Sequence, residues 1–188
     1  PFVAHSDYGS HVIEPIAQII ARPDSVEQDG VPNEDAQSME FDDTLLFDID
    51  KFSGYDRVET GLRANVGLQY TLQLDNGGYM RALFGQSYHL DGDNPFIEDR
   101  GLATDSSDIV TGIYLSPSVN YWLLSQARFD QSDFSVRRID ASVGANLGYA
   151  SGAVSYARAI EPDGGGGPDK LQEEIQADGR VSVTERWA

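Results

Sequence analysis

Residues 57–74 have the sequence RVETGLRANVGLQYTLQL, in which apolar and polar side chains alternate with one interruption, at Thr60. The even positions from Val58 to Leu74 are otherwise apolar, and the odd positions are polar or glycine. A period of two is typical of a β-strand, whose successive side chains point to opposite faces. At ~3.3 Å per residue the strand would be about 55 Å long, well beyond the usual strand of a soluble domain. We therefore predict a strand with lipid on its even face and a polar lumen on its odd face.

The same alternation recurs along the chain and predicts about eight antiparallel strands in up-and-down order. An Asn-Gly pair at residues 76–77 predicts a tight hairpin turn after the quoted strand, and further short turns are expected at residues 117–120 and 150–152. The first strand is expected at residues 11–21, where Pro15 predicts a bulge or a local irregularity. The predicted fold is all-β: an antiparallel up-and-down transmembrane β-barrel segment, with residues 1–188 forming one partial outer-membrane β-barrel domain.

Long and short connections are expected at opposite ends of these strands. The long ones, at residues 22–56, 91–107 and 161–172, share one end, where only the connection at 131–133 is short. This asymmetry is typical of outer-membrane barrels, with short periplasmic turns and long extracellular loops. The loop at 22–56 carries eleven acidic residues against Arg22 and Lys51.

That loop is expected to fold partly over the barrel mouth, because it is too apolar for a purely solvated segment. The residues expected to pack together or into the mouth are Phe41, Leu45, Leu46, Phe47, Phe52 and Tyr55. The acidic stretch at 42–50 could bind Ca²⁺, but it lacks the glycine and the terminal glutamate of an EF-hand loop. A solvated acidic loop is the simpler interpretation.

The composition excludes several classes of protein. Thirteen Lys and Arg against 31 Asp and Glu give a net charge of −18, which disfavours nucleic-acid binding. There is no cysteine, hence no disulfide and no thiolate site. No apolar run approaches the ~20 residues of a membrane helix. The three histidines, His5, His11 and His89, accompany no nucleophile motif, so we expect no catalytic residue, no metal site and no cofactor. Because the chain starts at Pro1, either a leader has been removed or a longer protein precedes it.

Charged and polar residues on the predicted lumen side are the first candidate site. They are Glu59, Arg63, Asn65, Arg81, Arg138 and Asp140. They could form a network or a track for an anionic lipid headgroup, or they could simply solvate the lumen. An arginine at Val66 should be costly on the lipid face, whereas an arginine at Asn65 should be nearly neutral.

Aromatic residues at the short-turn end are the second candidate site. Tyr121, Trp122 and Trp187 fall at one level and fit an interfacial aromatic belt, although ordinary strand aromatics are the plainer alternative.

Several segments together resemble the LptD (Imp/OstA) family of lipopolysaccharide-assembly outer-membrane proteins, with acidic loops most like those of alphaproteobacterial members. The most specific segment is Phe52, Ser53, Gly54, Tyr55, Asp56 and Arg57, which is similar to the family's Phe-Ser-Gly-x-Asp-Arg signature. Residues 11–18, 31–35, 41–47, 85–88 and 107–110 also look like family elements in the expected order.

The resemblance implies a slice of a much larger barrel in the outer membrane of a Gram-negative bacterium. It implies a non-enzymatic translocon that inserts lipopolysaccharide into the outer leaflet, with the sugar head in a polar lumen and the acyl chains leaving through a lateral opening. The implied partners are lipopolysaccharide, outer-membrane lipid, an LptE-like plug lipoprotein and the periplasmic lipopolysaccharide-transport bridge. Two alternatives stay open: a complete eight-stranded barrel with a structural or adhesive role, and an outer-membrane hydrolase.

Overall fold

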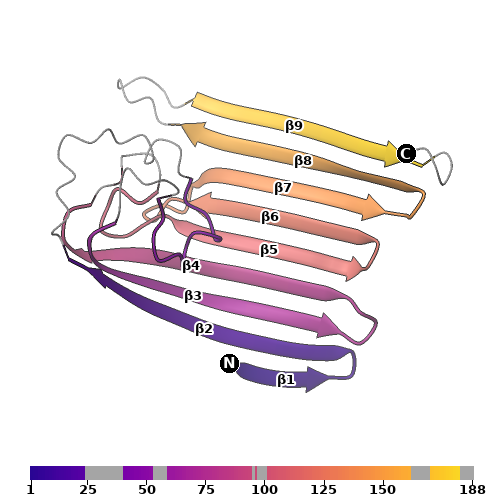
Figure 1. Cartoon of the computed structure of the whole chain (residues 1–188), viewed down its shortest axis with the longest axis horizontal. Helices are drawn as coiled ribbons and strands as arrows, with labels where there is room; N and C mark the ends of the chain where they lie inside the picture. Colours follow the sequence, from indigo (N-terminus) through magenta and orange to yellow (C-terminus); the bar gives the residue numbers. More distant parts are fainter. Residues whose placement is uncertain (24–39, 53–58, 95, 97–100, 162–169, 183–188) are drawn as a thin grey trace.

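Nine β-strands form a single antiparallel sheet in the computed structural model, which describes residues 1–23, 40–52, 59–94, 96, 101–161 and 170–182 (Figure 1). Each strand pairs with its neighbours in sequence, so the sheet is an up-and-down meander. The strands are β1 (Phe2–Ser6), β2 (Gly9–Arg22), β3 (Gly61–Leu74), β4 (Tyr79–Asp91), β5 (Ile109–Ser118), β6 (Tyr121–Phe129), β7 (Val136–Asn146), β8 (Ala150–Glu161) and β9 (Lys170–Val181). The all-β, antiparallel, up-and-down prediction is confirmed, but the strands number nine rather than about eight.

The additional strand is β1, which the sequence did not predict. Residues Asp7 and Tyr8 form a two-residue turn, and Ser6 pairs with Gly9 at the start of β2. The pairing continues only as far as Phe2 opposite Ile13. Five residues are too few for a convincing alternation, so this strand is recognised by its pairing rather than by its pattern.

The prediction of a bulge or local irregularity at Pro15 is wrong, because β2 pairs with β3 without a shift from Gly9 to Arg22. The hairpin after β3 explains why. Leu74 donates a backbone hydrogen bond of 2.7 Å to Gly78, so every second residue of β3, including Leu68, bonds toward β4. Pro15 is the partner of Leu68 and needs no N–H toward β3. On the other side of β2, the pairing with β1 extends only as far as Ile13 and does not reach Pro15.

Several strand boundaries differ from the prediction by a few residues. The strand expected from residue 57 begins at Gly61, whose φ of +86° turns the chain into the sheet. Glu59 and Thr60 lie just before it, outside the strand. The turn expected at residues 150–152 lies at 147–149, where Gly148 has a φ of +83°.

Long and short connections lie at opposite ends of the sheet, as predicted (Figure 1). We call these the long-loop end and the short-turn end. β1 and β9 are the two edge strands of the sheet, and the described residues show no pairing between them. Within the described part of the chain, no helix is long and apolar enough to cross a membrane.

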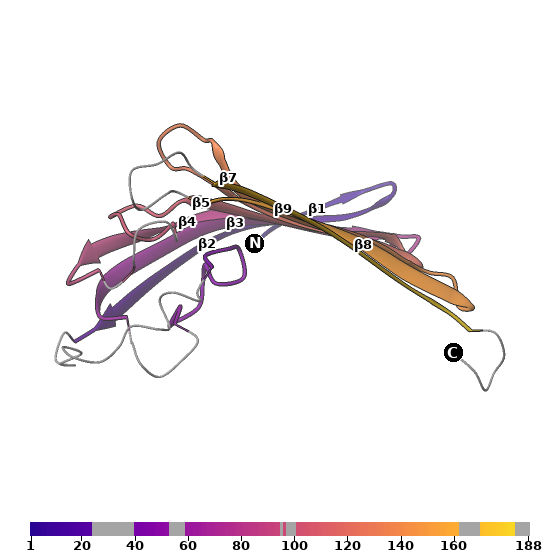
Figure 2. The same cartoon turned by 90° about the horizontal axis from the view of Figure 1, so that it is seen from above.

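The two faces of the sheet differ in chemistry. Residues 40–52 fold under one side of the sheet, seen edge-on in Figure 2, and we call that side the inner face. Most of the large apolar strand side chains that stay exposed lie on the opposite, outer face: Ile13, Ile19, Val66, Leu68, Phe84, Leu90, Ile113, Leu123, Val143, Val154, Leu171, Ile175 and Val181. Tyr114 and Leu124 are exposed on the inner face. The even positions of residues 61–74 are therefore on the apolar face; that this face meets lipid stays a prediction.

Candidate functional site

A row of glycines on the inner face makes room for the inward-folded segment, residues 40–52. Gly67 of β3 and Gly85 of β4 pair directly, and Gly112 lies on the adjacent strand β5. A Cβ on Gly67 would lie 2.9 Å from the ring of Phe47. A Cβ on Gly85 would overlap Leu46, and one on Gly112 would overlap the Asp43 carboxylate. We call this row the glycine trough, because any larger residue there would push the segment away from the sheet.

Apolar side chains hold the segment in this trough. Phe41 and Leu46 are fully buried, and they pack with Leu102 and with Val110 of β5. Leu45, Phe47 and Phe96 pack against this cluster. The prediction that apolar residues of the long loop pack together is confirmed for four of its residues: Phe41, Leu45, Leu46 and Phe47.

Amide and hydroxyl side chains tie the segment to the sheet. Gln18 of β2 donates a hydrogen bond of 3.1 Å to the Phe47 carbonyl. Asn65 donates to Gln18 at 2.7 Å and accepts from Ser87 at 2.6 Å, so three strands are linked beneath the segment. Asn65 is fully buried in this chain of bonds. The expectation that an arginine would be neutral at this position is therefore wrong.

Two acidic residues of the segment reach the far side of the trough. Gln126 of β6 donates to Asp43 at 2.8 Å and to Asp42 at 3.3 Å. Burial raises the pKa of Asp43, and the neighbouring Asp42 raises it further, while the bond from Gln126 lowers it. The acidic stretch is thus partly folded onto the sheet, and the described residues contain no group of acids arranged to hold a metal ion.

A buried charge cluster closes the trough at the long-loop end. Arg63 forms an ion pair with Glu59 and donates to the carbonyls of Asp48 at 3.0 Å and Ile49 at 3.1 Å. The Lys51 side chain is fully buried, with its Nζ 3.8 Å from Glu59 Oε1. Burial, with the nearby Arg63 guanidinium, lowers the pKa of Lys51 to about 6. Arg22 adds a further ion pair of 2.7 Å with Asp50.

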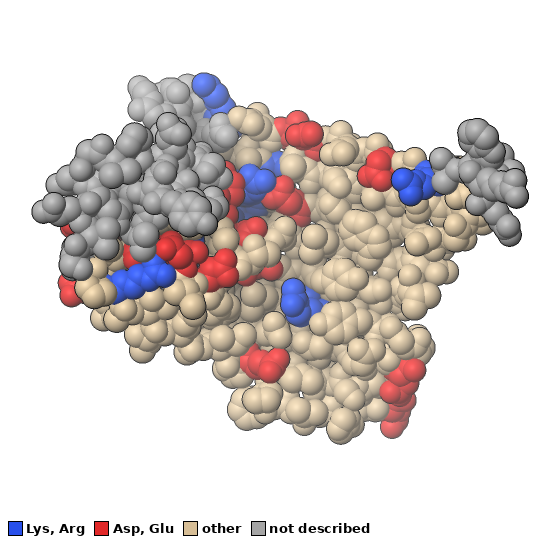
Figure 3. Space-filling view, viewed as in Figure 1, with Lys and Arg blue, Asp and Glu red and all other residues tan. Residues whose placement is uncertain are grey.

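A second cluster of charges lies on β6 and β7, at the same end of the sheet. Arg128 contacts Glu40 and Asp108, each at 3.3 Å, and Arg138 lies 3.6 Å from Glu40. Arg138 also donates to Asp140 at 2.6 Å. Burial raises the pKa of Asp108, although Arg128 opposes the shift. Figure 3 shows charged side chains gathered at the long-loop end, with few over the middle of this face.

The structure brings the predicted polar residues to one side of the sheet. Arg63, Asn65, Arg81, Arg138 and Asp140 lie on the inner face, and Glu59 lies at its edge beside Arg63. Only Arg63, Asn65 and Glu59 are buried; Arg81 is exposed. That this face lines a lumen stays a prediction.

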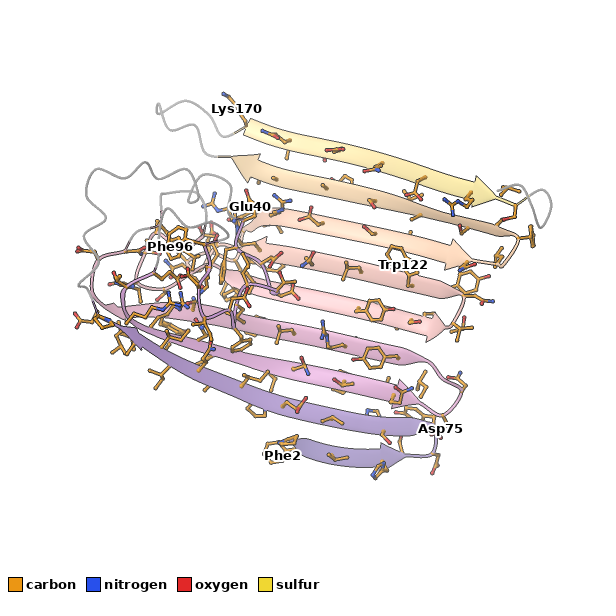
Figure 4. The ribbon with its side chains drawn as sticks, in the orientation of Figure 1. Phe2, Glu40, Asp75, Phe96, Trp122 and Lys170 are labelled. Carbon is orange, nitrogen blue, oxygen red and sulfur yellow. The ribbon has the colours of Figure 1, made fainter. Side chains whose placement is uncertain are left out.

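The predicted aromatic residues do not share a face. Tyr121 and Trp122 are adjacent in β6, so they point to opposite faces. Trp122 lies on the inner face (Figure 4), and Tyr121 therefore lies on the outer face. Trp187 lies outside the described residues. Of the signature residues, Phe52 is buried and stacks on Phe96 with a centroid distance of 4.9 Å, whereas Ser53, Gly54, Tyr55, Asp56 and Arg57 lie outside the described residues.

The histidines make local hydrogen bonds. His5 bonds to Ser10 at 2.9 Å, His11 to Ser6 at 3.1 Å and to Tyr70 at 2.8 Å, and His89 to the Gly92 carbonyl at 2.8 Å. Among the described residues, none of these bonds brings a carboxylate to a histidine. The hydrolase alternative therefore gains no triad from this geometry.

Sequence reasoning missed the glycine trough, together with Gln18, Ser87 and Gln126. Gly67 looks like an ordinary odd-face position, and Gly85 and Gly112 stand in no distinctive local pattern, so only the returning segment reveals their role. The sequence did contain one usable signal: neighbouring strand residues such as Tyr121 and Trp122 cannot belong to the same face.

An exposed apolar outer face and a polar inner face on one antiparallel meander are typical of the wall of a transmembrane β-barrel. The family model described as LPS transport system D, LptD, matches residues 2–187, and the chain belongs to this family. No curated protein matches the chain. Family membership confirms the resemblance identified from the sequence and links the chain to lipopolysaccharide transport at the outer membrane.

Proposed function

We propose that the nine strands form part of the wall of an outer-membrane translocon that inserts lipopolysaccharide into the outer leaflet. The observation that carries the proposal is the two-faced sheet, joined to a family match over residues 2–187. The outer face meets lipid, and the inner face lines the passage for the sugar head. The acyl chains leave through a lateral opening of the complete barrel.

The topology follows from the ends of the sheet. The long connections, with their acidic residues, lie outside a Gram-negative outer membrane, and the short turns lie in the periplasm. We do not propose a closed eight-stranded barrel. The sheet has nine strands, and its two edge strands do not pair with each other in the described residues.

The inward-folded segment has a structural role in this proposal. Residues 40–52 narrow the passage at its outer end and present acids and arginines on both sides of the trough. In this role the wall binds and guides the substrate without making or breaking covalent bonds, so it needs no catalytic residue and no cofactor.

The partners are lipopolysaccharide and outer-membrane lipid, together with an LptE-like plug lipoprotein and the periplasmic lipopolysaccharide-transport bridge. The plug would meet the inner face, and the bridge would deliver substrate at the short-turn end. Both assignments extend from the family and are tested by crosslinking.

The experiment is photocrosslinking in living cells with a photoreactive residue at Gln69 or at Leu68 of the parent protein. These neighbours in β3 lie on the inner and outer faces respectively. We expect lipopolysaccharide adducts at Gln69 that disappear when the transport bridge is depleted. Leu68 should crosslink lipid whether or not the bridge is present. No lipopolysaccharide adduct at Gln69 in active cells would contradict the proposal.

A further inference from the structure

Three aromatic side chains lie on the inner face near the short-turn end, on the neighbouring strands β4, β5 and β6. Tyr79 of β4 and Tyr114 of β5 contact each other with a centroid distance of 6.0 Å and an interplanar angle of 52°. Trp122 of β6 lies on the same face, two residues along the strand from Leu124, which is the partner of Tyr114. We call Tyr79, Tyr114 and Trp122 the aromatic platform.

The indole of Trp122 is held in place by a glycine. Trp122 pairs with Gly144 of β7, and its ring covers that residue so closely that a Cβ on Gly144 would overlap it. Gly144 is buried under the ring, while Trp122 itself remains partly exposed (Figure 4). The ring is therefore fixed against the sheet with one face available, which lowers the entropy lost when a ligand binds.

The platform is not part of the core that holds residues 40–52. That core is built from Phe41, Leu46, Leu102 and Val110, whereas Tyr114 is 36% exposed. The rings lie on the polar inner face, together with the exposed Leu124, and not on the outer face that carries most of the large exposed apolar side chains. Fixed aromatic rings left open on a polar face are typical of a binding site.

Polar groups and one exposed leucine, Leu124, lie next to the rings. Arg81 is exposed on the inner face and pairs with Tyr114 across the strands, and Ser116 pairs with Tyr79. On the far side, Ser142 bonds to Ser155 at 2.9 Å in the row next to Gly144. Flat rings combined with hydroxyl donors and acceptors and a single arginine match the chemistry of a sugar. The C–H face of a pyranose stacks on the negative face of an aromatic ring, and its hydroxyl groups need partners at the rim.

We propose that the aromatic platform binds the carbohydrate part of lipopolysaccharide, stacking sugar rings on Tyr114 and Trp122. Arg81 pairs with a phosphate or carboxylate substituent on those sugars. The assignment rests on the proposed function, because it makes the inner face the passage for the sugar head. It adds a defined contact on the periplasmic half of that passage.

The test uses the purified parent protein in detergent and fully deacylated lipopolysaccharide oligosaccharide as the probe. Binding is followed by saturation-transfer NMR and by titration. We expect Tyr114→Ala to weaken oligosaccharide binding by about threefold to tenfold, the range for loss of one aromatic contact. Gly144→Ala should weaken it similarly, because it displaces the Trp122 ring without removing it. Tyr114→Phe, which keeps the ring, should bind like the unaltered protein.

The matched control is Tyr121→Ala, which removes a neighbouring aromatic ring from the outer face. It should leave oligosaccharide binding unchanged. Each variant is first checked for heat-modifiable migration, so that unfolded protein is set aside and Tyr114→Phe still tests the site. Equal loss in Tyr121→Ala, or no loss in both Tyr114→Ala and Gly144→Ala, would overturn the platform.

In-cell crosslinking separates this inference from the proposed function. If a photoreactive residue at Gln69 captures lipopolysaccharide but one at Tyr114 captures only the plug lipoprotein, the platform is a protein contact and the inference fails alone. If neither position captures lipopolysaccharide, the proposed function fails with it. Capture at both positions, lost at Tyr114 in cells whose lipopolysaccharide lacks core sugars, supports the platform.

Discussion

Gln126 of β6 donates a hydrogen bond of 2.8 Å to Asp43, a residue 83 positions earlier in the chain. The bond crosses the inner face and fixes the returning segment to a strand that is not its sequence neighbour. Asp43 also occupies the space that a side chain on Gly112 would need. The loop and the sheet therefore specify each other's shape, and the passage proposed for the sugar head includes a folded segment as part of its wall.

Removing this bond should loosen the segment without unfolding the sheet. Gln126→Leu leaves Asp43 partly buried without its donor, at a local cost of about 1–3 kcal/mol. We expect faster proteolysis and faster amide exchange within residues 40–52. Ser125→Ala, on the outer face of the same strand, is the control and should leave both rates unchanged. Similar rates in the two variants would mean that Gln126 does not hold the segment.

Filling the glycine trough should have a larger effect. Gly85→Val places a branched side chain where Leu46 packs, so the segment must move away from β4. We expect a destabilisation of about 1–3 kcal/mol, measured by urea titration in detergent. The control is Gly179→Ala in β9, whose added Cβ would lie 3.7 Å from its nearest neighbour. A well-tolerated Gly85→Val would show that the segment does not occupy the trough.

Lys51 makes docking of the segment depend on pH. Its pKa is lowered to about 6 in the folded state, from 10.5 in an open chain. Between these two values the open state binds more protons, so the free energy of docking becomes more favourable as the pH rises from about 6 to about 10. Below about pH 6, Lys51 is protonated in both states and the penalty is complete.

The measurement is amide exchange of residues 40–52 at several pH values, corrected for intrinsic rates. We expect protection to increase with pH across this window and the increase to disappear in Lys51→Met, which keeps the buried stem without the charge. Arg22→Gln, which breaks the neighbouring ion pair with Asp50, should retain the pH dependence. A pH dependence that persists in Lys51→Met would assign it to another group.

The same substitution should destabilise the protein on the outer face of β3 and have little effect on its inner face. Val66→Arg puts a charge on the outer face, where it should cost about 2–4 kcal/mol in a bilayer near the midplane. Gln69→Arg puts it on the inner face beside Glu14, to which Gln69 donates at 3.1 Å, and should be nearly neutral. Refolding titrations into lipid vesicles give both values. Equal costs would remove the assignment of lipid and lumen to these faces.

Much of the fold could be predicted because the decisive signal is local. Alternation over residues 61–74 predicts a strand and its two faces, and the turn at residues 75–78 predicts the next hairpin. Signals that depend on distant partners could not be found in this way. β1 is defined by its pairing with β2. Pro15 is tolerated because the backbone of its partner Leu68 forms its hydrogen bonds toward β4 and needs none from Pro15. Likewise, Asn65 looks like any lumen residue until Gln18 and Ser87 are placed beside it.

The last prediction concerns the two edges of the sheet. β1 covers β2 only from Gly9 to Ile13, so the backbone of β2 from Glu14 to Arg22 has an open edge, and β9 forms the other edge. Open backbone is costly in lipid, so further strands should cover both edges in the complete barrel. The 188-residue chain contains no cysteine, so disulfides between introduced cysteine pairs can be followed without background.

Ala17→Cys with Ile175→Cys joins the two edges, whereas Val154→Cys with Ala177→Cys joins paired positions of β8 and β9. After refolding in detergent, the pair Val154→Cys with Ala177→Cys should form a disulfide within a monomer. The first pair should give crosslinked oligomers or none, because open edges meet other chains before they meet each other. Efficient crosslinking of the first pair within a monomer would show that the nine strands close on themselves and would favour a small independent barrel.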